Sequence, residues 1–347
     1  MTNDAMTPAF RGFSMPAEWA PHAATWLSWP NERGATYPEA RLGPILPHFH
    51  RLVKALVEGG EKVVINLSDE TEWVLISAAV PPEILASVSW NLNPTNEPWC
   101  RDHGPTVLRH ADGTRIAMCW NYNSWGEKYP PWDLDAAAGR GMAKAAGLEI
   151  HHRPDLTIEG GSLESNGAGV LMVSESSVVT ASRNPGRSRE ELARELCDCT
   201  GMREVLWVNA DVEGDDTDGH VDCYARFAPG DRLLVLDPTP AQSIRHASLA
   251  SNARALRAVC AERGWEFIGL PIPEPIYEGE QVLPATYANF YIANEAVIMA
   301  TFEDPCDDVA AERIAAAFPD RRLTKIPARE LIFGQGGFHC LTQQLPG

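Results

Sequence analysis

The apolar positions of this chain form short runs and longer periodic segments that follow one another in a fixed order. Short runs such as GVLMV at 169–173 and RLLVL at 232–236 are typical of buried strands. Longer stretches carry apolar residues at helical spacing, and strand-like runs flank them. The predicted helices span 45–59, 186–197, 242–264 and 308–318, and further predicted strands span 62–67, 203–208, 265–270, 296–300 and 321–327. The pattern predicts a repeated unit of strand, helix and strand.

The length of the repeat favours blades arranged around an axis. Val170, Leu233 and Val297 belong to equivalent apolar runs and are spaced by 63 and 64 residues. Units longer than about 50 residues are unusual in solenoids, whereas blades around a central axis bury such units well. Five units of about 69 residues would fit the chain. We therefore expect an α/β fold, a pseudo-fivefold, five-bladed α/β propeller of ββαβ units, with residues 1–347 as a single domain.

Four chemically active residues recur with a similar spacing. Asp102, Glu159, His220 and Cys340 are separated by 57, 61 and 120 residues, so that the last gap is close to two repeats. Because equivalent loops of a closed propeller converge on its axis, we expect these four side chains in one central funnel. One repeat position near residue 280 is vacant, and some part of 277–287 is predicted to border the same funnel. Its polar candidates are Glu278, Glu280 and Gln281.

Cys340 follows a glycine-rich loop near the end of the chain. Gly334, Gly336 and Gly337 precede it, and glycine allows the backbone to approach a ligand closely. The loop would therefore expose the thiol to a substrate, with Gly337 beside it. The alternative is a buried strand thiol, because CLTQQL at 340–345 also has the pattern of a short strand.

His220 and Asp222 are two residues apart in a segment that we predict to be a strand. Alternate residues of a strand face the same side, so both side chains could enter one pocket. Histidine transfers protons near neutral pH, and a carboxylate beside it can bind a cation or hold the imidazole. A metal site is the competing interpretation, but this segment offers no obvious third ligand. Asp102 and Glu159, taken singly, would pass for turn or capping residues.

Charge and cysteine content restrict the classes of function. The net charge of −18, from 29 basic and 47 acidic side chains, disfavours nucleic acid and anionic membranes as partners. It suits a small cationic substrate, although ordinary solubility explains the charge equally well. The eight cysteines are scattered, which is typical of reduced thiols, and the same holds for the Cys197-x-Cys199 pair. No secretion signal or membrane span is evident, so we expect a cytoplasmic protein, and homo-oligomer formation remains open.

A thiol, an imidazole and several carboxylates in one funnel suit a guanidinium substrate. Two carboxylates can bind the N–H groups of the planar cation and leave its central carbon facing a thiolate. Attack by Cys340 and protonation of the departing nitrogen by His220 would release ammonia. Water activated by His220 would then hydrolyse the S-alkylthiouronium intermediate to a ureido product.

The segments that carry these residues resemble a known family. The chain is similar to the agmatine deiminases and Porphyromonas-type peptidylarginine deiminases over nearly its whole length, from Met15 to Gln344. The matching segments are MPAEWAPHAATWLSWP, WCRDHGP, EGGSLE, GDDTDGHVD, YANFYIAN and GQGGFHCLTQQ. Two departures stand out, since agmatine deiminases commonly have asparagine at the position of Cys223 and a different sequence at 336–338.

The resemblance implies a pentein fold and hydrolysis of a guanidinium group without a metal or organic cofactor. Matched residue by residue, it implies that Cys340 is the nucleophile and His220 the acid and base. It further implies that Asp102 and Asp222 bind the guanidinium and that Glu159 orients the histidine.

Three functions follow as hypotheses. Hydrolysis of agmatine to N-carbamoylputrescine leads, peptidylarginine or another guanidino compound is the enzymatic alternative, and a non-catalytic pentein binding protein is the remote one. The tail of the substrate is expected to contact acidic and aromatic side chains. The candidates are Trp99, Trp125, Asp216 and Asp218, with Asp215 and Trp29 as further possibilities.

Overall fold

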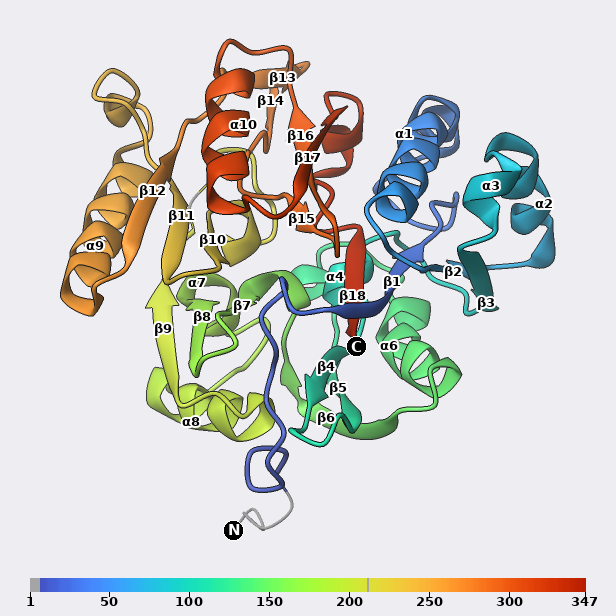
Figure 1. The fold of residues 1–347 in the computed structure, drawn as a ribbon, viewed down its shortest axis with the longest axis horizontal. Helices are drawn as coiled ribbons and strands as arrows, with labels where there is room; N and C mark the ends of the chain where they lie inside the picture. The colour runs from blue at the N-terminus through green and yellow to red at the C-terminus, as the bar shows by residue number, and fades with distance from the viewer. Residues whose placement is uncertain (1–6, 211) are drawn as a thin grey trace.

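The computed structural model describes residues 7–210 and 212–347. In this part of the chain, five sheets share one pattern of strand pairing. The first strand of each pattern pairs antiparallel with the second, a helix follows, and the third strand returns parallel to the second. Figure 1 shows the main helices around the outside of the molecule and the strands toward its centre. The predicted α/β character is therefore confirmed.

Four of these sheets are built from consecutive segments. Their helices are α6 (Asp133–Ala145), α8 (Arg189–Thr200), α9 (Ala247–Arg263) and α10 (Cys306–Ala317). Their strands are β4 (Thr106–Arg109), β5 (Arg115–Asn121) and β6 (Glu149–Thr157); β7 (Leu163–Ser165), β8 (Val170–Ser174) and β9 (Glu204–Val208); β10 (Ala225–Ala228), β11 (Arg232–Leu236) and β12 (Glu266–Leu270); β15 (Tyr291–Ile292), β16 (Ala296–Thr301) and β17 (Arg322–Pro327).

The fifth sheet joins the two ends of the chain. Its strands are β18 (Thr342–Pro346), β1 (His22–Ser28), β2 (Val63–Leu67) and β3 (Val88–Leu92), and its helix is α1 (Glu39–Glu58). Leu27 pairs with Thr342 across the antiparallel β1 and β18, which lie side by side near the centre of the view (Figure 1). The segment after Cys340 is thus held by the N-terminal part of the chain.

Shorter elements lie between the main strands and helices. They are α2 (Glu70–Ala79), α3 (Pro82–Leu85), α4 (Cys100–His103), α5 (Ser124–Glu127), α7 (Glu175–Val178), η2 (Gly160–Ser162), η3 (Val221–Cys223), η4 (Gln242–Ile244), η5 (Leu331–Gly334), β13 (Ile276–Glu278) and β14 (Gln281–Leu283). Four of them, α4, η2, η3 and η5, matter for the site, because each lies in or near a turn that leads into the first strand of one of the five sheets.

The helices and strands predicted from apolar periodicity occur close to their expected positions. Helix α8 begins after a capping box, in which Ser188 and Glu191 satisfy each other's backbone N–H groups, and ends at Gly201. The long segment predicted at 242–264 is instead divided into η4 and α9. Fully buried residues such as Phe49, Leu52 and Val297 confirm that the apolar stripes face the core.

The prediction that His220 and Asp222 lie on a strand is wrong. His220 precedes the 3₁₀ helix η3, and β10 begins only at Ala225. Asp215 explains the difference, because its carboxylate accepts the backbone N–H groups of Thr217 and Gly219 and folds this segment into a tight turn. The expected alternation of side chains therefore does not apply here.

None of the helices in residues 7–210 and 212–347 combines the length and the apolar character needed to cross a membrane.

Two helix-ending glycines give a test of packing in the fold. Gly201 ends α8 with φ of 68°, and a Cβ there would lie 1.9 Å from the backbone oxygen of Phe13. Gly264 ends α9 with φ of 72°, but apart from its own chain neighbours no atom of residues 7–210 and 212–347 lies within 4 Å of its Cβ position. Gly264→Ala should lower the free energy of unfolding by about 1–2 kcal/mol, the cost of the left-handed conformation. Gly201→Ala should lower it clearly further, because the N-terminal segment must also move.

Urea denaturation of both variants measures this difference. Equal losses for the two glycines would contradict the close contact between α8 and the segment at Phe13.

Candidate active site

The four residues with repeat spacing occupy equivalent places in the fold. Asp102 lies in α4 before β4, Glu159 precedes η2 before β7, and His220 precedes η3 before β10. Cys340 lies in the turn before β18. Each therefore sits just ahead of the first strand of a sheet, as the repeat spacing predicted.

Three of the polar side chains converge on the backbone of Gly161. A Cβ atom at this glycine would lie 2.5 Å from His220 Nδ1, 2.8 Å from Asp102 Oδ1 and 3.2 Å from Asp222 Oδ2. Any larger residue would therefore displace the cluster. The sequence placed Gly161 beside Glu159 and the structure gives its physical role, because only glycine allows the acidic groups and the imidazole to meet.

Asp102 is buried among donors and acids. Its Oδ1 accepts the Gly161 N–H at 2.9 Å, and its Oδ2 accepts the Trp125 indole N–H at 3.0 Å. Burial raises the pKa of Asp102 to about 6, and the charges of Asp222 and Glu159 act in the same direction, whereas His220 opposes them. The pKa of Asp102 thus lies close to neutral pH, where the carboxyl group can exchange a proton.

His220 lies between two carboxylates. Its Nδ1 is 3.6 Å from Asp102 Oδ1, and its Nε2 is 3.6 Å from Glu159 Oε2. Neither ring nitrogen has a hydrogen-bond partner among the described residues. Burial alone would lower the pKa of His220, but the charges of Asp102, Glu159 and Asp222 outweigh it and raise the value to about 9. The imidazole is therefore protonated at neutral pH.

Glu159 is held by Arg183, a residue that the sequence analysis did not single out. The Arg183 Nε lies 2.8 Å and 2.9 Å from the two carboxylate oxygens of Glu159, and both side chains are fully buried. Its other nitrogens donate to Asp218 Oδ2 at 2.7 Å and to the Thr217 backbone oxygen at 2.9 Å. Burial raises the pKa of Glu159, yet Arg183 and His220 reverse this effect and lower it overall.

Asp222 is oriented from the opposite side by His339. The imidazole of His339 bridges two carboxylates, with Nδ1 2.6 Å from Asp222 Oδ2 and Nε2 2.7 Å from Glu18 Oε2. Arg226 reaches the second oxygen of Glu18 at 3.0 Å. Burial opposes ionisation, but His339 and nearby cations lower the pKa of Asp222 to about 2. Its Oδ1 is buried and has no hydrogen-bond partner among the described residues.

Cys340 is fixed by its neighbours on both sides. Its sulfur lies 3.5 Å from Asp222 Oδ2 and 3.1 Å from the Asn289 side-chain nitrogen. Asn289 Oδ1 in turn accepts the backbone N–H groups of His339 and Cys340 at 3.1 Å and 3.3 Å. A hydrogen bond from Cys223 lowers the pKa of Cys340, but burial and the charges of Asp222 and Asp102 raise it overall.

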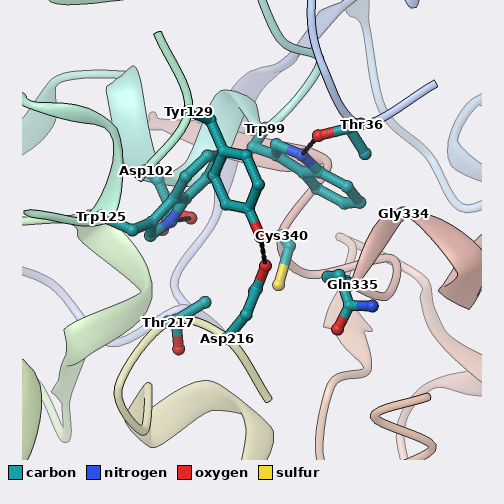
Figure 2. A pocket seen from close by; sticks show the side chains of 11 residues that line it. Thr36, Trp99, Asp102, Trp125, Tyr129, Asp216, Thr217, Gly334, Gln335 and Cys340 are labelled. Carbon is teal, nitrogen blue, oxygen red and sulfur yellow. Dashed lines mark hydrogen bonds between the residues drawn. The ribbon is translucent and has the colours of Figure 1, made fainter. Parts of the chain in front are cut away.

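A pocket of about 280 Å³ opens onto this cysteine. In the view of Figure 2, the Cys340 sulfur lies between the carboxylate of Asp216 and the side chain of Gln335. The rings of Trp99, Trp125 and Tyr129 lie above it in the same view. Within the pocket, the Tyr129 hydroxyl donates to Asp216, and the Trp99 indole donates to Thr36. The lining residues are Thr36, Trp99, Asp102, Trp125, Tyr129, Asp216, Thr217, Gly334, Gln335, Gly336 and Cys340.

The residues predicted to bind the substrate fall into two groups. Trp99, Trp125 and Asp216 line the pocket. Asp218 and Gly337 do not belong to its lining: Asp218 bridges Arg183 and Lys128, and Gly337 packs against Asn289, whose Oδ1 would lie 2.6 Å from a Cβ at that position.

None of the described residues that line this pocket belongs to 277–287, but the Thr286 hydroxyl donates to the Cys223 backbone oxygen at 2.7 Å. That this segment borders the funnel therefore stays a prediction. Residues 276–283 form the hairpin β13–β14, and Glu278 pairs with Arg41. Asn289 is the polar residue of the fifth position that reaches Cys340. The hairpin β13–β14 occupies the expected position near residue 280, and the residue that reaches Cys340 lies further along the chain. Asn289 belongs to the segment YANFYIAN, to which the sequence analysis gave no catalytic or binding role.

Known proteins of one family resemble this chain over nearly its whole length. The family model of the Porphyromonas-type peptidyl-arginine deiminases matches residues 14–346. The chain belongs to this family. The agmatine deiminase of Ectopseudomonas mendocina is 31% identical and covers 100% of this chain and 99% of its own length.

Solved structures of the family are similar throughout. The agmatine deiminase of Enterococcus faecalis has a TM-score of 0.89 at 25% identity, covering 98% of this chain and 97% of its own. That of C. jejuni has a TM-score of 0.84 at 26% identity, covering 96% of each chain. The expected resemblance and the expectation of an agmatine deiminase-like hydrolase are thus confirmed.

Replacing Arg183 tests whether it compensates the charge of Glu159. Arg183→Met would leave a buried carboxylate without its cation, and we expect a loss of about 3–5 kcal/mol in the free energy of unfolding. Arg263→Met is the matched control, since Arg263 contacts both oxygens of Glu204 at the surface, and its loss should be about 1 kcal/mol or less. Urea denaturation of both variants decides, and similar losses would contradict the role of Arg183.

NMR titration of the imidazole tests the electrostatics of His220. We expect its pKa at about 9, and Asp102→Asn should lower it by removing the strongest of the stabilising charges. The pKa of His220 in the folded protein lies above the value of about 6.5 expected in the unfolded chain, so protonation of His220 stabilises the fold. This stabilisation is fully present below about pH 6.5. The stabilisation is lost as pH rises through about 9.

The control is Glu204→Gln, which removes a surface carboxylate and should leave this titration unchanged. A His220 pKa below its ordinary value would contradict the assignment of charge to the cluster.

Proposed function

We propose that this protein hydrolyses a guanidinium group to a ureido group and ammonia with Cys340 as nucleophile, and that its substrate is agmatine, which becomes N-carbamoylputrescine. The observation that carries the proposal is one cluster of a thiol, an imidazolium and two carboxylates, of which Cys340 and Asp102 line the pocket. Cys340 lies 3.5 Å from Asp222, and His220, Asp102 and Asp222 share the space around Gly161.

The carboxylates bind the substrate cation. Asp102 lines the pocket, and Asp222 lies behind it, 3.5 Å from the Cys340 sulfur, with an Oδ1 that has no partner in the described part of the chain. Paired charge-assisted hydrogen bonds to the guanidinium N–H groups fix its plane and place its central carbon beside the Cys340 sulfur. The bound cation also offsets the negative charges that raise the pKa of Cys340, so that binding favours the thiolate.

The protonated His220 supplies the acid. The Cys340 thiolate forms a bond to the guanidinium carbon and gives a tetrahedral adduct. Proton transfer from His220 to a nitrogen of the adduct allows the C–N bond to break, and ammonia leaves. The product of this half-reaction is a covalent S-alkylthiouronium.

The second half-reaction uses the same residues in reverse. Neutral His220 accepts a proton from water, the resulting hydroxide attacks the thiouronium carbon, and the C–S bond breaks. The ureido product leaves, and the cysteine is regenerated. Glu159 holds the histidine in place through its ion pair with Arg183, so its role is to position and charge the imidazole.

The pocket and the relatives favour a small substrate. Trp99 and Trp125 line the pocket that opens onto Cys340 and offer apolar surface to an aliphatic chain. Asp216 lies at its wall as a partner for a terminal amine. Relatives over the full length are named agmatine deiminases. Peptidylarginine, which the family name suggests, is the second candidate and requires room for a peptide backbone.

The architecture proposed with this function is a five-bladed propeller that forms one domain over 1–347. The support is the shared pairing of five sheets within the described residues and the pairing of β18 with β1. In this arrangement the turns that carry Asp102, Glu159, His220 and Cys340 are equivalent loops that meet on the axis.

Activity assays test the proposal directly. The protein should release ammonia and N-carbamoylputrescine from agmatine, with much lower turnover of free arginine and of an arginyl peptide. Cys340→Ser should reduce turnover to a few per cent or less, because a hydroxyl is a far poorer nucleophile at this site. Ammonia release and mass spectrometry of the product measure both effects.

The matched control is Cys260→Ser, a buried cysteine of α9. It should retain turnover. Full activity of Cys340→Ser would remove the cysteine from the mechanism, and preference for the peptide would replace agmatine with peptidylarginine.

A further inference from the structure

A second thiol lies beside the proposed nucleophile. The sulfurs of Cys223 and Cys340 lie within 3.5 Å and 3.1 Å of the same Asn289 side-chain nitrogen. Ligand atoms of Asp222, Cys223 and Cys340 all lie within 4.8 Å of one another, which sets an upper limit on the distance between the two sulfurs. The mechanism proposed above uses Cys340 and gives no chemical step to Cys223.

The two thiols differ in access. Cys340 lines the pocket, whereas Cys223 is buried behind it and is not part of the lining. A small oxidant that enters the pocket therefore meets Cys340 first. Cys223 can take part only through Cys340, which is the arrangement of a reactive and a resolving cysteine.

We propose that Cys223 is a resolving cysteine, which forms a reversible disulfide with Cys340 after a peroxide has oxidised Cys340. This inference rests on the proposed function only for its consequence, which is that the disulfide switches off the deiminase and shields its nucleophile from irreversible oxidation.

The chemistry balances with a peroxide as the sole oxidant. The Cys340 sulfur attacks hydrogen peroxide, the O–O bond breaks, and a sulfenic acid and one water form. The Cys223 sulfur then attacks the sulfenic sulfur, the S–S bond forms, and the S–O bond breaks. The departing hydroxide takes the Cys223 proton and leaves as a second water. The two thiols have then lost two hydrogen atoms and two electrons to the peroxide.

Formation of this bond requires local movement. A disulfide requires the sulfurs to approach to about 2.05 Å, so one or both side chains must rotate. Cys223 belongs to the short η3 and Cys340 to the turn before β18, so neither is fixed inside a long helix or a sheet. Asn289 is the group that must give way, since its amide contacts both sulfurs.

The experiment treats the full-length protein with hydrogen peroxide in the presence of a chelator, then adds dithiothreitol. The intact mass should fall by two hydrogen atoms, and peptide mapping should find Cys223 joined to Cys340. Activity with agmatine should be lost and then largely regained after reduction. Cys223→Ser should lose activity but regain little of its own starting value, because the sulfenic acid proceeds to forms that dithiols do not reduce.

Cys260→Ser is the matched control, and it should recover as the unsubstituted protein does. Full recovery of Cys223→Ser, a disulfide between other cysteines, or peroxide-treated protein in which Cys223 stays a free thiol would each overturn the proposal. Peptide mapping of the unsubstituted protein decides even where Cys223→Ser fails to fold. That readout requires no turnover, so failure of the proposed function is distinguishable from failure of the disulfide.

Discussion

The site depends on the compensation of buried negative charge. Asp102, Glu159, Glu164, Asp222 and Glu18 are all buried, and an uncompensated carboxylate in such surroundings would be strongly unfavourable. The protein compensates most of them with cations from other parts of the chain, since Arg183 pairs with Glu159, and Arg226 pairs with Glu18 and Glu164. Among the described residues, Asp102 has no arginine partner of this kind, its pKa is raised to about 6, and it lines the pocket that contains Cys340.

The distribution of charge separates the roles of chemically identical groups. Burial raises the pKa of Asp102 to about 6, whereas His339 and neighbouring cations hold that of Asp222 at about 2. Both side chains are aspartates near Gly161, so their different behaviour comes entirely from their partners. The negative charges of the same carboxylates raise the pKa of His220 to about 9, so that its imidazole is protonated at neutral pH. The result is an imidazolium between two carboxylates, and one of them, Asp102, lines the pocket that also contains Cys340.

The strands, the helices and the positions of four site residues could be predicted from the sequence, because they follow from periodicity. The apolar runs specified the repeated strands and helices, and the repeat spacing brought Asp102, Glu159, His220 and Cys340 to equivalent turns. The partners of these residues could not be found in that way. Arg183 lies after α7 and outside the repeat phase, and Glu18 lies in the N-terminal segment, yet both reach the site through contacts that only the folded chain defines. The tight turn at Asp215 was missed because side-chain to backbone hydrogen bonds override the apolar pattern locally.

The position of the cysteine links the chemistry to the completion of the fold. Strand β18 pairs with β1, so the turn that carries Cys340 is placed only when the two ends of the chain meet. The Arg101 backbone N–H also donates to the Cys340 oxygen at 3.0 Å, and Arg101 reaches Gln344 and Glu18 with its guanidinium. Arg101, the neighbour of Asp102 in the sequence, therefore helps to fix the position of Cys340. The contacts of β1 with β18, and of Arg101 with Cys340 and Gln344, join residues more than 200 positions apart. Placing the thiol beside the carboxylates therefore requires the closure of long stretches of chain, which costs conformational entropy.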